Sequence, residues 1–192
     1  MVRAGYDEVM SGSKNRYDLG SGDAQKGEKE NITQIMWPSD LHPSFAPEKS
    51  KLHQRGLQLA KALLGDDMAF DFDMLINKLT DTVTPFHQDA SYWPDTPDTR
   101  ALSFWVALEP DMIDEDRGCM WYGPGTHEQP LRKHETSGPA SASFRCEGTE
   151  EECVPEPLGP GDVAVHGGRT LHYSRGNKSG KPRRAYIMNF RP

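Results

Sequence analysis

The segment His87-Gln88-Asp89 carries the most evident chemistry in this sequence. In an extended chain, side chains two residues apart point to the same side, so this imidazole and this carboxylate can face one point. Together they are two of the three ligands of a two-histidine, one-carboxylate metal site, which leaves open positions on a non-haem iron(II) ion. A His-x-Asp pair is common by itself, so the interpretation depends on a third ligand downstream.

The last thirty residues offer that ligand. His172 and Ser174 share a face of the strand-like segment Leu171–Ser174. A turn-rich stretch, Arg175–Pro182, separates them from a second strand-like segment that begins at Arg183. If the two arms pair antiparallel, Arg183 lies beside the His172–Ser174 end. A guanidinium binds a carboxylate through two parallel hydrogen bonds. The patch therefore predicts a site for a dicarboxylate that also touches the metal.

His166 is the alternative third ligand. It lies six residues before His172 and is followed by Gly167-Gly168. The spacings to Ser174 and Arg183 relate to His172 rather than to His166, which favours His172 and leaves His166 as the competing assignment.

The chain resembles the phytanoyl-CoA dioxygenase family of iron(II)/2-oxoglutarate oxygenases over roughly residues 55–192. The order and spacing of several short motifs carry the resemblance, and they are Met74–Lys78, Thr84–Trp93, Ala101–Trp105, Gly118–Met120, Pro124–His127 and Gly161–Arg184.

The resemblance implies roles for individual residues. The iron(II) ligands, which are also the catalytic residues, would be His87, Asp89 and His172. The co-substrate 2-oxoglutarate would be bound by Arg183 at its C5 carboxylate, with Ser174 assisting, and its pocket would be lined by Met74 and Trp105. Halogenating relatives carry a small residue where this chain has Asp89, so the carboxylate favours hydroxylation with O2.

We therefore expect a dioxygenase that hydroxylates a C–H bond of a small organic substrate while 2-oxoglutarate is converted to succinate. The aromatic residues expected on the substrate side are Tyr92, Trp93, Trp121 and Tyr122. Two alternatives stay open: a non-oxidative, cupin-like metal enzyme, and a non-catalytic binding protein on a decayed oxygenase fold. Arg183 and Ser174 disfavour the first, and the intact ligand set disfavours the second.

Composition narrows the class of protein. The 192 residues suit one domain, residues 1–192, and 22 basic against 29 acidic residues give a net charge of −7. An acidic chain without a broad basic face is a poor nucleic-acid binder. No stretch is apolar enough to span a membrane, and the N-terminus lacks the apolar core of a signal peptide. With three cysteines, an odd number, free thiols in the cytoplasm are expected.

The hydrophobic pattern predicts a mostly β protein with flanking helices. A helix is expected over 47–64, with Leu52, Leu59, Ala60, Leu63 and Leu64 on its apolar face. From residue 69 the period changes to two. Strands are expected at Ile32–Trp37, Ala69–Leu79, Ala101–Leu108, Gly118–Tyr122, Asp162–His166, Leu171–Ser174 and Ala185–Phe190. Short strands separated by Pro, Gly and Asp clusters indicate a double-stranded β-helix, the cupin-like jelly roll, as the core over 69–192.

Two segments fit this core less directly. Residues 1–46 are polar, with a helical turn expected at Tyr6–Met10 and a loop at Ser11–Asn31. Members of the family are usually longer here, so the segment is expected to be a truncated or a naturally minimal form. Residues 124–160 include a long polar insertion, and loops of that length are often lids or disordered.

Overall fold

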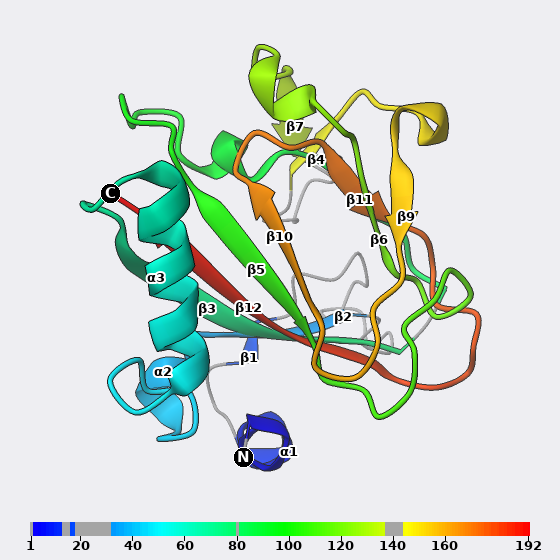
Figure 1. Ribbon diagram of the computed structural model, residues 1–192. Coiled ribbons are helices and arrows are strands. Elements are labelled where there is room, and N and C mark those ends of the chain that lie inside the picture. Colours follow the sequence, from blue (N-terminus) through cyan, green and yellow to red (C-terminus); the bar gives the residue numbers. More distant parts are fainter. Residues whose placement is uncertain (1, 13–15, 18–31, 80, 137–143) are drawn as a thin grey trace.

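The computed structural model describes residues 2–12, 16–17, 32–79, 81–136 and 144–192. Within them, two antiparallel sheets face each other (Figure 1). The large sheet has the order β1 (Arg16–Tyr17), β2 (Ile32–Met36), β3 (Ala69–Lys78), β12 (Arg183–Arg191), β5 (Leu102–Ala107) and β10 (Val163–Gly167). The small sheet has the order β4 (Thr84–His87), β11 (His172–Ser174), β6 (Met120–Tyr122) and β9 (Val154–Glu156). This is a double-stranded β-helix, and the predicted jelly roll is confirmed.

Helices cover the outer face of the large sheet (Figure 1). They are α1 (Val2–Gly12), α2 (Pro38–Leu41) and α3 (Lys51–Leu64), and three short 3-10 turns are η2 (Asp89–Tyr92), η3 (Thr126–Glu128) and η4 (Glu150–Glu152). The helix α1 is longer than the turn expected at Tyr6–Met10. Tyr6 and Val9 are buried in the same core as strand residues of the large sheet, and the Tyr6 hydroxyl donates to the Ile76 carbonyl at 3.0 Å.

The helix α3 differs from its prediction at its start and on its buried face. It begins at Lys51 rather than at residue 47, because the Ser50 hydroxyl caps it by accepting from the His53 N–H. The buried residues are His53, Gly56 and Ala60, whereas Leu59 and Leu63 are 41% and 58% exposed. A Cβ on Gly56 would lie 3.0 Å from the Phe190 ring, so the glycine lets the helix approach the sheet closely. Small residues therefore make the closest contact with the sheet, while Leu52 and Leu64 of the predicted face are half-buried and pack against the same core.

The predicted hairpin between the segments of His172 and Arg183 is wrong. β11 pairs with β4 and β6, whereas β12 pairs with β3 and β5 in the other sheet. Tyr173 of β11 stacks on Phe86 with ring centroids 4.1 Å apart, while Tyr186 of β12 belongs to the core under the helices. β12 contributes to both cores, because Ala185 lies in the same cluster as Tyr173. The turn between β11 and β12 therefore crosses from one sheet to the other instead of joining neighbours.

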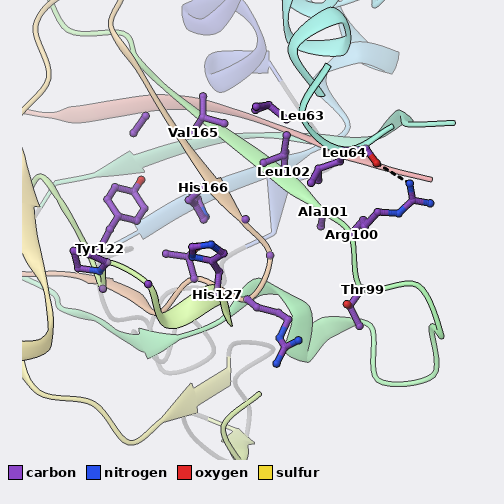
Figure 2. A pocket seen from close by; sticks show the side chains of 18 of the residues that line it. Leu63, Leu64, Thr99, Arg100, Ala101, Leu102, Tyr122, His127, Val165 and His166 are labelled. Atoms are coloured by element: carbon purple, nitrogen blue, oxygen red, sulfur yellow. Dashed lines mark hydrogen bonds between the residues drawn. The ribbon is translucent and has the colours of Figure 1, made fainter. Parts of the chain in front are cut away.

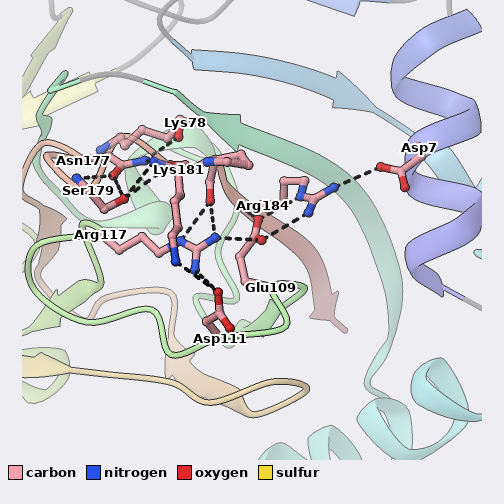
Figure 3. Close-up of polar contacts among 10 residues, drawn as sticks. Asp7, Lys78, Glu109, Asp111, Arg117, Asn177, Ser179, Lys181 and Arg184 are labelled. Carbon is pink, nitrogen blue, oxygen red and sulfur yellow. Dashed lines mark hydrogen bonds and ion pairs between the residues drawn. The ribbon is translucent and has the colours of Figure 1, made fainter.

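That crossing turn is held by a polar network, which Figure 3 shows. Asn177 donates to the carbonyls of Lys78 and Lys181 at 3.0 and 2.6 Å. Arg117 donates to the Pro182 carbonyl at 2.7 Å and pairs with Glu109 at 2.9 Å. The backbone just before Arg183 is therefore fixed on both sides.

The described part of the insertion expected at 124–160 contains regular secondary structure. It contains a two-stranded sheet of β7 (His134–Thr136) and β8 (Phe144–Cys146), and β9 completes the small sheet. Residues 137–143 of the insertion, and most of the loop expected at 11–31, lie outside the described residues. None of the described helices is long and apolar enough to cross a membrane.

Candidate metal and co-substrate site

Three predicted ligands converge between the two sheets. One ligand atom from each of His87, Asp89 and His172 lies within 4.8 Å of the others. Oδ1 of Asp89 is 3.7 Å from His87 Nε2 and 3.5 Å from His172 Nε2. β4 ends at His87 and η2 begins at Asp89, but Gln88 between them is extended, with φ −131° and ψ 126°. The alternation expected of a strand therefore holds across this junction and places both ligands on one side.

The backbone fixes the orientation of both histidine rings. Nδ1 of His87 lies 2.8 Å from the Pro85 carbonyl oxygen, and Nδ1 of His172 lies 2.9 Å from that of Thr170. A carbonyl oxygen can only accept, so each Nδ1–H donates to its carbonyl, and each Nε2 faces Asp89. Metal-binding histidines are usually held in this way. Burial and the neighbouring His172 lower the pKa of His87 to about 3, which keeps its imidazole neutral.

Asp89 presents one oxygen to the histidine pair and has the other oxygen occupied. Ser103 donates to Oδ2 at 2.6 Å, and His166 Nε2 lies 3.2 Å from the same atom. Burial alone would raise the pKa of Asp89, but His172 and His166 hold it well below its usual range, so the group is a carboxylate. The arrangement leaves Oδ1 free to bind a metal ion and places His166 behind Asp89.

Gln88 secures the His-x-Asp segment from the opposite side. Its side chain is 1% exposed, donates to the Arg169 carbonyl at 2.6 Å and accepts from the Arg132 N–H at 2.9 Å. Its own backbone N–H donates to His134 Nε2 at 3.1 Å. The residue between the two ligands thus joins them to the insertion and to the loop before His172.

The cluster opens into a cavity of about 540 Å³ between the sheets. Arg183, Met74 and Trp105 all line this cavity. The Arg183 guanidinium lies 4.7 Å from the centre of the Trp105 ring, a cation–π contact. Three of the four predicted co-substrate residues therefore share one space with the predicted metal ligands, whereas Ser174 is fully buried and is not among the residues that line it.

Arg183 is a buried cation without a carboxylate among the described residues. It is 2% exposed, its Nη2 contacts the Met120 sulfur at 2.9 Å, and its Nε has no hydrogen-bond partner. Burial lowers its pKa to about 10, so it stays charged at neutral pH. A buried charge without a partner is costly. The geometry therefore suits an anionic ligand that enters the cavity and pairs with Arg183.

Lys78 stands behind Ser174 and fixes its hydroxyl. Lys78 is fully buried, and its Nζ lies 2.7 Å from Ser174 Oγ, 3.0 Å from Thr84 Oγ1 and 3.3 Å from the Arg175 carbonyl. Three acceptors match the three N–H bonds of an ammonium group. Burial and the nearby Arg183 hold the pKa of Lys78 well below its usual range. Because Ser174 accepts from Lys78, its own O–H is left to donate elsewhere.

The four aromatic residues expected on the substrate side divide into two pairs. Tyr92 and Trp93 line the cavity. Trp121 is buried on the other face of β6, against Tyr173 and under the Arg175 guanidinium. Tyr122 stacks on His172 and lines a second, more open hollow of about 820 Å³ beside β10, which Figure 2 shows together with His166.

The fold and this geometry can be compared with known proteins. The family model of phytanoyl-CoA dioxygenase (PhyH) matches residues 8–185, nearly the whole chain. The chain belongs to the PhyH family.

Among curated PhyH proteins, the chain is 33% identical over 110 residues to phytanoyl-CoA dioxygenase domain-containing protein 1 of Bos taurus. That match covers 54% of this chain and 37% of the bovine protein, so the chain spans well under two thirds of its relative's length. The solved structure of EvdO2 from Micromonospora carbonacea var. aurantiaca, complexed with 2-oxoglutarate, is 28% identical, with a TM-score of 0.79 over 98% of this chain and 79% of that one.

The epimerase SnoN, solved with Fe3+, α-ketoglutarate and nogalamycin RO, is 22% identical, with a TM-score of 0.77 over 97% of this chain and 71% of that one. At that identity it shows a shared fold alone.

Reasoning from the sequence missed several residues of this PhyH site. Gln88, Ser103 and Lys78 have no independent signal in the sequence, because their partners lie up to 99 residues away along the chain. Only their places in the sequence hint at a role for two of them. Gln88 stands between two predicted ligands, and Lys78 ends a strand whose alternate residues face the cavity.

Proposed function

We propose that this PhyH-family protein is an iron(II)- and 2-oxoglutarate-dependent oxygenase that hydroxylates a C–H bond of a small organic molecule. The observation that carries the proposal is Arg183, a buried guanidinium with no carboxylate partner among the described residues, in the same cavity as a three-residue metal cluster. A site of this kind fits a co-substrate with one end on the metal and a carboxylate at the other.

The donor set fits iron(II). In this proposal His87 and His172 bind through Nε2 and Asp89 through Oδ1, because the other atoms of these side chains are occupied. Two imidazoles and one carboxylate are the ligand set of non-haem iron(II) oxygenases. With 2-oxoglutarate and O2, bound iron supplies an oxidant that can break a C–H bond, and 2-oxoglutarate leaves as succinate and CO2.

The protein's own residues orient the co-substrate. Arg183 pairs with its far carboxylate, and the Ser174 hydroxyl, held by Lys78, donates to the same group. Trp105 and Met74 pack along the carbon chain on the cavity wall. Ser103 and His166 hold the second oxygen of Asp89, so that it binds the metal through one oxygen and leaves positions for the co-substrates.

The two alternatives fit the site less well. A non-oxidative, cupin-like enzyme has no use for an unpaired guanidinium beside its metal. A non-catalytic descendant has no reason to keep both histidine tautomers and both Asp89 oxygens in place. Hydroxylation, rather than another oxidative outcome, is proposed from Asp89, whose carboxylate completes the ligand set.

The proposal also covers the setting of the enzyme. Cys119, Cys146 and Cys153 are free thiols, and burial raises the pKa of Cys119 and of Cys153 to about 11. Protonated, buried thiols suit a reducing compartment, and we place the protein in the cytoplasm on that basis.

The test is the coupled binding of metal and co-substrate. Under anaerobic conditions, iron(II) and 2-oxoglutarate together are expected to give a weak visible charge-transfer band that neither gives alone. Under air, succinate is expected to form only when both are present. A folded, iron-loaded sample that gives neither the band nor succinate would rule out the proposal.

A further inference from the structure

Beyond the metal cluster and Arg183, the cavity wall is uncharged. Asp89 and Arg183 are the only described residues lining it that carry a carboxylate, an ammonium or a guanidinium group. Both already have a role in the proposed function. The Gln34 side-chain oxygen is a neutral acceptor on the same wall, and it has no hydrogen-bond partner in the described part of the chain. A charged substrate entering here would lose its water and meet no further counter-charge among the described residues of the wall, which is costly.

Aromatic rings dominate the same wall. Trp37 and Phe72 are 6.3 Å apart between ring centroids, and Phe72 and Trp93 are 6.5 Å apart, so three rings form a row. Tyr92 and Phe144 form a second pair at 4.9 Å, and the Tyr92 hydroxyl accepts from the Phe144 N–H at 3.2 Å. All five side chains line the cavity. Ring faces and edges of this kind pack well against another flat ring.

Two of these rings are exposed in a way that other described aromatic side chains are not. Trp37 is 45% exposed and Tyr92 is 41% exposed. The other described Phe, Trp and Tyr side chains are buried or half-buried. Both exposed rings therefore belong to the rim of one cavity, and such clustered apolar exposure marks a binding surface.

Trp37 is also held in a strained backbone conformation. Its φ of 57° and ψ of 47° make it the one non-glycine residue with positive φ among those described. The left-handed region costs about 1–2 kcal/mol for an L-residue. The Trp37 N–H donates to the Asp73 carbonyl at 2.9 Å, which keeps the backbone in this place. Strain that persists at a pocket rim is typical of a functional position.

We infer that the substrate is an uncharged molecule with a flat, apolar ring system, which lies against Trp37, Phe72 and Tyr92 at the outer part of the cavity. The inference rests on the proposed function, since it names the substrate class of that same site. The buried metal cluster and Arg183 hold the co-substrate, and the aromatic outer part holds the molecule that is oxidised.

An acyl-CoA is the main rival, because the family takes its name from phytanoyl-CoA. The phosphates of coenzyme A would need basic side chains at the rim. The described lining offers only Arg183, which is 2% exposed and faces the co-substrate position. Aromatic rings also suit a linear, saturated chain less well than they suit a flat ring.

The experiment compares three probes of one shape and different charge. The protein is loaded anaerobically with iron(II) and saturating 2-oxoglutarate, so that Arg183 is occupied. Equilibrium dialysis then measures the binding of 2-naphthalenemethanol, 2-naphthoate and 2-naphthylmethylammonium, with decanoyl-CoA as the rival. The neutral alcohol is expected to bind about tenfold more tightly than either charged probe, as the cost of desolvating a charge predicts. Tighter binding of the naphthoate, or of decanoyl-CoA, would overturn the inference.

Variants locate the bound probe. Trp37→Gly removes the indole and relieves the backbone strain, so it is expected to weaken the neutral probe about tenfold without lowering the melting temperature. Phe72→Ala is expected to act in the same direction, and Trp37→Phe to restore most of the affinity. Met112→Ala changes a side chain that is 52% exposed and does not line the cavity, so it serves as the control. Affinity unchanged in both Trp37→Gly and Phe72→Ala would place the substrate elsewhere.

The two levels of the proposal fail separately. If iron and 2-oxoglutarate do not bind together, the proposed function is wrong. If they bind normally while the charged probes bind as well as the neutral one, the oxygenase assignment stands and the substrate class is wrong.

Discussion

Arg183 and Arg184 are neighbours on one strand and differ in what neutralises them. Arg184 donates from Nε to Glu109 Oε1 at 2.8 Å and from Nη1 to Asp7 at 3.1 Å, within the network of Figure 3. Arg183 meets a ring face and a sulfur atom, and no carboxylate among the described residues. Their pKa values move in opposite directions: Glu109 raises that of Arg184, and burial lowers that of Arg183 to about 10.

The difference follows from strand alternation, and it distinguishes a charge with a structural role from a charge that serves a ligand. Adjacent strand residues point to opposite faces of a sheet. Arg184 therefore points to the side of the large sheet where α1 lies, and Arg183 points into the cavity. Carboxylates of the protein neutralise Arg184, whose role is therefore structural. No carboxylate among the described residues neutralises Arg183, and an unpaired buried cation in a cavity indicates a site for an anion.

The largest effect is expected on the cavity side, from His172→Ala. Removing one of three ligand donors leaves a site that no neighbouring group can complete, so metal binding is expected to be lost. His166→Ala is the matched control, because His166 contacts Asp89 Oδ2 rather than the face that Oδ1 presents. It is expected to keep most of the metal affinity in a titration. The reverse order would make His166 the third ligand.

Glu109→Gln tests whether the ion pairs around Arg184 stabilise the fold. Glu109 is 2% exposed and pairs with both Arg117 and Arg184. Neutralising it leaves two cations without their shared partner, which is expected to lower the free energy of unfolding by about 3–5 kcal/mol. The affinity of the folded fraction for 2-oxoglutarate is expected to stay the same. A large loss of co-substrate affinity at full stability would mean that the two arginines do not have separate roles.

The sequence was sufficient for the parts of this site that depend on residue type and spacing. His87, Asp89 and His172 converge as predicted because two short motifs with fixed spacing lie on strands that pair. Six of the described strands overlap segments predicted from a period of two or from β-forming residues in the core, whereas β7, β8 and β9 were not predicted. These features are local, and local patterns are visible in a sequence.

The parts that were wrong depend on tertiary neighbours. The pattern of α3 placed Leu59 and Leu63 on the buried face, but the helix approaches Phe190 through Gly56, which leaves these two leucines exposed. The turn before Arg183 suggested a hairpin, but β11 pairs with β4 and β6, and β12 pairs with β3 and β5 in the other sheet. Such choices are made by side chains far apart in the sequence, so a pattern within one segment does not contain them.

Arg183→Lys tests whether the cavity arginine acts through its geometry as well as its charge. A lysine keeps the charge but replaces the two-pronged guanidinium with a point charge. Losing one charge-assisted hydrogen bond costs about 1.5–3 kcal/mol, so the dissociation constant for 2-oxoglutarate is expected to rise about tenfold to a hundredfold. Metal affinity measured without 2-oxoglutarate is expected to survive. Arg184→Lys is the control on the opposite face, and an equal effect from it would move the carboxylate clamp to Arg184.

The smallest effect is expected from Lys78→Met, which removes the group behind Ser174. Without the 2.7 Å contact to Lys78 Nζ, the Ser174 hydroxyl loses the donor that fixes its orientation. One hydrogen bond of net worth about 0.5–1.5 kcal/mol then weakens, which raises the dissociation constant for 2-oxoglutarate about twofold to tenfold. Calorimetry with 2-oxovalerate, which lacks the far carboxylate, is the matched control and is expected to show no change. Since both residues act on the same carboxylate, Lys78→Met and Ser174→Ala together are expected to be less than additive. Equal losses for both ligands would mean that Lys78 supports the fold rather than the orientation of Ser174.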